Sequence, residues 1–173
     1  MKIRLRIWRQ KNGQASGKLV DYEIDGIVIK LNDLDELMEQ KFKDIDQVRR
    51  EYPNMVQLFK NSSFPPEIIT GLSRTLDYFG EVPLIVRSSS LLEDRFGTAF
   101  SGKYKSLFLA NQGDKKERLE ALLDAVAEVW ASVLGPDPIE YRRERGLTEF
   151  VEEMGILIPE VIGRRVGDWW LPA

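Results

Sequence analysis

The sequence predicts an α+β domain, in which short strands and longer helices follow an N-terminal β-hairpin. Alternating residues at 3–9 (IRLRIWR) and 19–25 (LVDYEID), with turn residues between them, predict the hairpin. A β-branched apolar run at 82–90 (VPLIVRSSS) predicts a buried strand, and apolar residues at helical spacing from Lys116 predict a long helix. A chain of 173 residues is long enough for one domain core plus an appendage.

Two absences in the composition exclude several reaction classes. The chain has 0 His and 0 Cys. Disulfides, cysteine-ligated zinc, iron–sulfur clusters, Ser-His-Asp triads and phosphohistidine are therefore excluded. Lys, Arg, carboxylates and hydroxyls remain, and these groups suit the handling of phosphates and hard cations.

Charge and hydropathy bear on the partners. A net charge of -3 and a pI near 5.2 argue against a nucleic-acid partner. No apolar run approaches the roughly 20 residues that span a bilayer, so no membrane partner is expected. The location expected from the sequence is the cytoplasm.

The middle of the chain carries helix signals. Pro65 and Pro66 predict a helix start and Gly80 a C-terminal cap. Residues 33–51 predict one or two exposed helices, and Pro53 is expected to end or redirect the chain there. The long helix has its apolar face formed by Leu119, Leu122, Leu123, Val126, Trp130 and Val133.

The last third predicts further strands. Residues 105–110 (KSLFLA) predict a second strand, and residues 154–163 (MGILIPEVIG) a core strand interrupted by Pro159. A Gly-Pro-Asp-Pro break at 135–138 precedes a short helix. The chain ends on large apolar residues, Trp169 and Trp170 among them, so a missing C-terminal half or a partner is expected to cover them.

The residues with phosphate-binding chemistry lie in the segment RSSSLLEDRFGTAFSGKYK, from Arg87 to Lys105. Arg87 follows a buried strand and offers a permanently charged fork for phosphate oxygens. Gly97 and Gly102 permit tight turns in which backbone N–H groups approach an anion. The segment is not a Walker loop. The alternative is that Arg87 pairs with Glu93 or Asp94 and the glycines only turn the chain.

Three strings resemble the nucleotide-binding module of phosphoenolpyruvate synthases and pyruvate phosphate dikinases. They are VPLIVRSSSLLEDRFGTAFSGKYKSLFLANQG, EVWASVLGPDPIEYRRERG and MGILIPEVIG, and the resemblance covers about residues 52–173. It implies a partial ATP-grasp-like fold, a mixed sheet with flanking helices. It also implies an ATP-dependent kinase or phosphotransferase that uses ATP with magnesium.

The resemblance assigns site residues one by one. Arg87 would contact ATP phosphates, and a loop containing Phe100, Ser101 and Gly102 would lie over them. It would also place Ile158, Glu160 and Val161 against the adenine. The hydroxyls of Ser88 and Ser89, beside the arginine, add hydrogen-bond donors by their chemistry alone. Trp130 and Tyr141 would be core residues. No catalytic residue and no metal ligand is assigned within the chain.

The chain also departs from the family pattern. Pro159 stands where the family usually has Gln, and proline offers neither an amide side chain nor a backbone donor. The family's N-terminal Lys-bearing segment, its later half with the magnesium-binding carboxylates and its histidine domain are not found in this sequence. The chain is therefore expected to be a truncated, inactive portion of such an enzyme. The alternative is a catalytically dead scaffold or interaction module that keeps the packing.

Residues 1–27 resemble a different family, the opening hairpin of the succinate dehydrogenase iron–sulfur subunit. Without cysteines the resemblance cannot imply electron transfer. A fused or mis-joined reading frame would explain it, and a coincidental hairpin is the alternative. The resulting domain division is an N-terminal hairpin at 1–29, a helical connector at 30–63 and the nucleotide-binding portion at 64–173.

Overall fold

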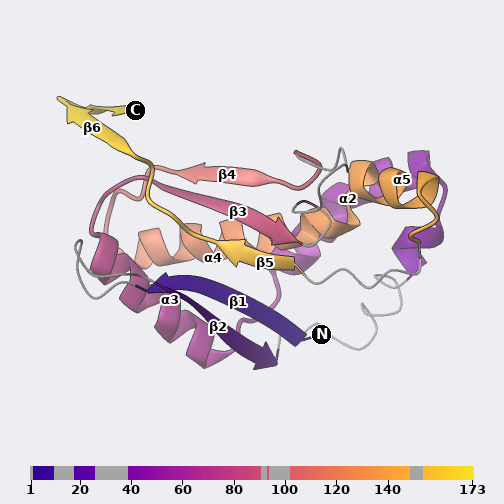
Figure 1. Ribbon diagram of the computed structural model, residues 1–173, viewed down its shortest axis with the longest axis horizontal. Coiled ribbons are helices and arrows are strands. Elements are labelled where there is room, and N and C mark those ends of the chain that lie inside the picture. The colour runs from indigo at the N-terminus through magenta and orange to yellow at the C-terminus, as the bar shows by residue number, and fades with distance from the viewer. Residues whose placement is uncertain (1, 10–17, 26–38, 91–92, 94–101, 149–153) are drawn as a thin grey trace.

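The computed structural model describes residues 2–9, 18–25, 39–90, 93, 102–148 and 154–173 (Figure 1). Its strands are β1 (Lys2–Arg9), β2 (Lys18–Asp25), β3 (Leu84–Ser90), β4 (Ser106–Leu109), β5 (Met154–Leu157), β6 (Gly163–Val166) and β7 (Trp169–Pro172). Its helices are α2 (Ile45–Lys60), α3 (Pro66–Phe79), α4 (Lys115–Ala131) and α5 (Pro136–Glu144), with short 3-10 turns η1 (Gln40–Phe42) and η2 (Ser132–Leu134). The fold is α+β, as the sequence predicts.

The central sheet has the strand order β4-β3-β5. β3 pairs antiparallel with β4, where Arg87 lies opposite Ser106, and antiparallel with β5, where Arg87 lies opposite Leu157. A mixed sheet was expected, but all strand pairings among the described residues are antiparallel. Parallel neighbours would need a crossover that returns the chain to the same end of the sheet, and the described strands are not arranged in that way.

Two further strand pairs accompany the sheet. β1 pairs antiparallel with β2, and β1 runs beside β5 (Figure 1). β6 pairs antiparallel with β7, and this pair extends beyond the sheet at the C-terminal end (Figure 1). Trp169 is 77% exposed there and Trp170 is half-buried.

Helix α2 corrects the expectation that Pro53 ends or redirects the chain, because the helix runs through this residue from Ile45 to Lys60. Proline removes one helical hydrogen bond. The helix continues because it buries Val48, Met55 and Phe59 on one face. Met55 and Phe59 of α2 belong to the same hydrophobic core as buried residues of α3, β3 and α4.

Helix α3 starts and ends where the sequence predicts, and α4 starts one residue before the predicted Lys116. Pro66 occupies the first turn of α3, and Gly80 ends it with a φ of 66°. Asp114 begins α4 with a capping box, in which its side chain accepts from the N–H of Glu117 and the Glu117 carboxylate accepts from the N–H of Asp114. These caps satisfy backbone groups that a helix end would leave without partners.

The core lies between the helices and one face of β3. Leu84 and Val86 are 0% exposed and belong to the same cluster as Leu122 and Val126 of α4. Trp130 and Tyr141 are also buried in it, which confirms that both are core residues. None of the helices in the described part of the chain is long and apolar enough to cross a membrane.

Candidate functional site

Strand β3 presents two different faces. Leu84, Val86 and Ser88 are buried, whereas Arg87 between them is exposed. Successive side chains of a strand point to opposite faces, so Arg87 points away from the helices that cover the buried face. The resulting side of the central sheet is called the open face below.

A row of side chains crosses the open face at Arg87. In antiparallel pairs, directly opposed residues place their side chains on the same face. Ser106 of β4 and Leu157 of β5 lie opposite Arg87 on its two sides. The arginine therefore lies in the middle strand, flanked by a hydroxyl and an apolar side chain.

A second, apolar row lies next to it. Phe108 of β4 is opposite Ile85 of β3, and its side chain is 71% exposed. On the other side, the backbone N–H of Ile85 donates to the carbonyl of Pro159 at 3.0 Å. The rows at Ile85 and Arg87 are separated by about 6.6 Å, the rise of two strand residues. An apolar platform thus adjoins a permanent positive charge.

Within the described residues, the Arg87 guanidinium makes no hydrogen bond and no ion pair. The alternative expectation, pairing with Glu93, is not observed, and Asp94 lies outside the described residues. An arginine has five N–H donors in a rigid fork. Its position in the central strand, and the absence of a partner for it among the described residues, leave these donors available to an anion.

The serines next to Arg87 fall on different faces. Ser88 is 3% exposed and points to the buried face, whereas Ser89 is half-buried and shares the open face with Arg87. The Ser90 hydroxyl is also buried and accepts a hydrogen bond from the backbone N–H of Glu93 at 3.2 Å. Of the three hydroxyls, that of Ser89 is the one beside Arg87.

The loop expected to cover the phosphates is described only at its end. Gly102 is exposed and has a φ of 81°, a backbone conformation that residues other than glycine rarely adopt. Phe100 and Ser101 lie outside the described residues. Gly102 therefore supplies a left-handed turn shortly before β4 begins.

The segment after β5 runs along β3, where the three expected adenine contacts lie. Glu160 forms a bridge with Leu84, and the Val161 N–H donates to the Pro83 carbonyl at 2.8 Å. Ile158 packs against the core. Because the residues flanking Glu160 make the bonds to β3, the N–H and carbonyl of Glu160 itself point away from this strand.

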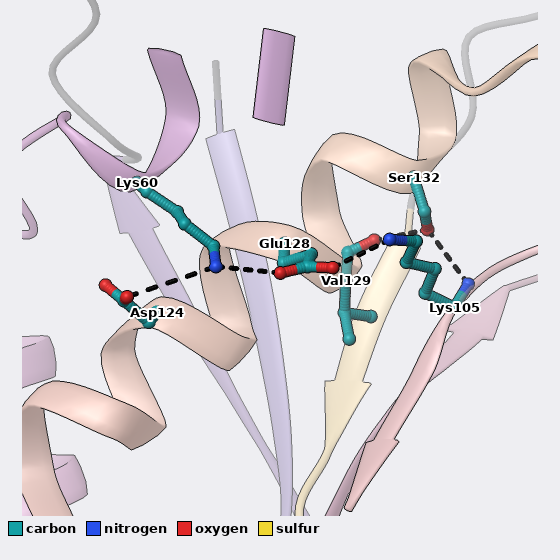
Figure 2. Close-up of polar contacts among 6 residues, drawn as sticks. All are labelled: Lys60, Lys105, Asp124, Glu128, Val129 and Ser132. Atoms are coloured by element: carbon teal, nitrogen blue, oxygen red, sulfur yellow. Dashed lines mark hydrogen bonds and ion pairs between the residues drawn. The ribbon is translucent and has the colours of Figure 1, made fainter. Parts of the chain in front are cut away.

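A charged network holds the start of β4 from behind the sheet (Figure 2). The Glu128 carboxylate of α4 accepts from Lys105 Nζ at 2.7 Å and pairs with Lys60 Nζ at 2.8 Å. Burial raises the pKa of the Glu128 carboxyl, but hydrogen bonds from Lys105 and Lys60 outweigh burial, so its pKa lies below the ordinary value. The same hydrogen bond acts in the opposite direction on the lysine, and it raises the pKa of Lys60.

Sequence reasoning missed several residues of this arrangement. Ser106 and Phe108 share the face of Arg87, and Glu128 holds Lys105 from α4. The alternation in KSLFLA places Ser106 and Phe108 on one face of their strand, so part of the signal was present. The contact between Lys105 and Glu128 spans 23 positions and has no local signature.

Metal binding finds no support in the described ranges. They contain no group of three or more Asp, Glu, His or Cys side chains that could hold a metal ion. Magnesium would therefore reach the site bound to ATP.

The comparison with protein families agrees with the resemblance. The family model of the pyruvate phosphate dikinase AMP/ATP-binding domain matches residues 27–167. The matched range contains β3, β4 and β5, and hence every residue of the open face named above. The chain therefore belongs to the pyruvate phosphate dikinase AMP/ATP-binding domain family.

Proposed function

We propose that the open face binds the phosphates of ATP through Arg87, as the nucleotide-binding portion of a phosphotransferase of the phosphoenolpyruvate synthase and pyruvate phosphate dikinase type. The supporting observation is an exposed arginine in the middle strand that has no protein partner among the described residues. A guanidinium held in this way matches phosphate oxygens with paired hydrogen bonds. The match to an AMP/ATP-binding domain family indicates that the phosphates belong to an adenine nucleotide.

Two further parts of the chain would contact the nucleotide, one at the adenine and one over the phosphates. The adenine would lie along Ile158, Glu160 and Val161, where the backbone groups of Glu160 point away from β3. Phe100, Ser101 and Gly102 would form the loop over the phosphates, with Ser89 as an additional donor beside Arg87. This arrangement would form one wall of an ATP-grasp-like cleft, and magnesium would arrive bound to ATP.

Binding and phosphoryl transfer are separate claims. A dikinase passes the phosphoryl group through histidine, and this chain has 0 His. We expect no phosphoenolpyruvate from pyruvate, ATP and this chain alone. An enzyme-dependent yield of phosphoenolpyruvate would contradict this expectation.

A second candidate is a scaffold that keeps the packing and binds no nucleotide. The observation that favours it is Pro159, which stands beside Ile85 on the open face and carries no polar side chain. The two candidates differ in a single measurable property, the affinity for ATP.

Titration calorimetry with MgATP tests the proposal. A charge-assisted hydrogen bond is worth about 1.5 to 3 kcal/mol, so Arg87→Ala is expected to weaken binding by roughly tenfold to a hundredfold. Arg164→Ala is a matched control, because Arg164 is an exposed arginine of β6 outside the central sheet. No heat at millimolar nucleotide would favour the scaffold, and equal affinity of wild type and Arg87→Ala would remove the role of Arg87.

A further inference from the structure

Three contacts within the described part of the chain hold the segment immediately before β4. The Lys105 ammonium donates a hydrogen bond to the Glu128 carboxylate at 2.7 Å, and the Lys105 backbone N–H donates to the Ser132 hydroxyl at 3.2 Å (Figure 2). The Tyr104 hydroxyl accepts from Nη1 of the buried Arg142 at 3.4 Å. All three partners belong to the helical layer, two to α4 and its C-terminal extension and one to α5.

The partners are themselves held in place. Glu128 also pairs with Lys60 of α2 at 2.8 Å, and the Ser132 hydroxyl donates to the Val129 carbonyl at 2.5 Å. Arg142 donates to the Val133 carbonyl at 2.6 Å. The contacts therefore tie residues 104 and 105 to side chains that further hydrogen bonds and an ion pair hold in place.

This fixed point lies one residue from the open face. Ser106 follows Lys105 and lies directly opposite Arg87. Lys105 bonds to α4, whose residues Leu122 and Val126 pack with the buried face of β3. The lysine therefore points to the side of the sheet opposite Arg87, and its ammonium is not placed to contact a phosphate bound there.

We propose that Glu128 is a positioning residue for the nucleotide: by holding Lys105, it fixes the backbone opposite Arg87 and so sets the affinity for ATP from the far face of the sheet. This inference rests on the proposed function. Glu128 itself touches no ligand, and its effect passes through Lys105.

The two halves of the Glu128 network supply a matched comparison. Lys105→Gln removes the half that reaches β4, and Lys60→Gln removes the half that reaches α2, while both leave Glu128 in place. We expect Glu128→Gln and Lys105→Gln to weaken MgATP binding by about three- to tenfold, a usual size for coupling between separated sites. Lys60→Gln is expected to keep wild-type affinity while lowering the midpoint of urea unfolding.

A double variant tests whether Lys105 acts through Glu128. If it does, Glu128→Gln combined with Lys105→Gln weakens binding no more than either change alone. Additive losses would show that the lysine acts on the nucleotide by another route and would overturn the proposal. If Glu128→Gln does not fold, Lys105→Gln alone decides, because its side chain is 41% exposed.

The outcomes separate this proposal from the function on which it rests. Wild-type affinity in Lys105→Gln, or an equal loss in Lys60→Gln, overturns the positioning role while Arg87→Ala still reports on the nucleotide site. Absence of ATP binding by the wild-type chain overturns both proposals.

Discussion

Pro159 accepts a hydrogen bond from the backbone N–H of Ile85 at 3.0 Å and returns none, because proline has no N–H. The next residue pair of the ladder has the same defect. The Pro83 carbonyl accepts from the Val161 N–H at 2.8 Å, but Pro83 has no N–H to donate to Val161. The ladder between β3 and the segment after β5 therefore lacks a bond on each side of Glu160. This explains why β5 ends at Leu157 and only an isolated bridge follows.

Replacing Pro159 with Gln separates backbone from side-chain effects. The restored N–H faces β3, so it would add a ladder bond of about 0.5 to 1.5 kcal/mol, offset by about 0.4 to 1 kcal/mol from the freer unfolded chain. The net change in unfolding free energy is expected to stay within about 1 kcal/mol, and the new amide to exchange slowly with solvent. If the side chain reaches a phosphate, ATP affinity rises by roughly tenfold to a hundredfold.

Pro159→Ala is the control, because it restores the same N–H without an amide side chain. Tighter binding by the Gln variant than by the Ala variant, measured with a fluorescent ATP analogue, would assign the gain to the side chain. Equal affinity of all three proteins would show that Pro159 is not what limits binding.

Phe108 provides a test for the base. Its ring is 71% exposed, so Phe108→Ala is expected to change the unfolding free energy by no more than about 0.5 kcal/mol. Because the adenine is proposed to lie along Ile158, Glu160 and Val161, on the other side of β3, Phe108→Ala is expected to keep an ATP affinity near that of wild type. Stacking of a base on an aromatic ring is worth about 1 to 3 kcal/mol, so a loss of about fivefold or more would instead place the base on β4. Inorganic tripolyphosphate has no base, and its affinity should not change. A loss for both ligands would place the phosphates, instead of the base, near Phe108.

Gly102 is expected to tolerate no side chain despite open space around it. A Cβ there would meet nothing within 4 Å, but the φ of 81° is strained for any other residue. Gly102→Ala should lower the unfolding free energy by about 1 to 2 kcal/mol. Gly71→Ala is the opposite control, because this helical glycine also has open space and an ordinary φ, and alanine there should stabilise by about 0.5 to 1 kcal/mol. Urea denaturation of both variants checks the pair.

The Glu128 network predicts a dependence of stability on acid. The pKa of Glu128 is lowered in the folded state from an ordinary value of 4.5. Its stabilisation is therefore fully present above pH 4.5 and is lost as the pH falls through the folded-state value. The difference in unfolding free energy between wild type and Glu128→Gln should shrink in acid.

Glu120→Gln controls for general charge effects, since this carboxylate lies on the same helix with 64% of its side chain exposed. The difference in unfolding free energy between Glu120→Gln and wild type should remain small at every pH. A Glu128→Gln difference that stays constant down to about pH 3 would contradict the assigned cause.

Local signals predicted the helices well, because a cap or an apolar face is written in consecutive residues. Pro65, Pro66 and Gly80 mark the ends of α3. Pro53 was wrong as a stop signal, since burial of Met55 and Phe59 outweighs one lost hydrogen bond. A local rule could not weigh that burial, which depends on helices elsewhere in the chain.

The site could be predicted only in part for the same reason. The sequence and the family resemblance select Arg87, and the strand period places Ser88 and Ser89 on opposite faces. Which side chain lies opposite Arg87 depends on the register between β3 and β4, which residues far apart in the chain determine together. The role of Lys105 is equally non-local, because it depends on Glu128 and Ser132.

The contrast between Lys105 and Ser106 constrains the register of β4 against β3. Neighbouring residues serve opposite sides of the sheet, one bonded to α4 and the other beside Arg87. A one-residue shift of this register would exchange these sides, bringing an ammonium next to the guanidinium and leaving the Glu128 carboxylate without one of its cations. Such a shift would disrupt the Glu128 network and the arginine row together, whereas a substitution at Lys105 alone removes only the side-chain contact with Glu128.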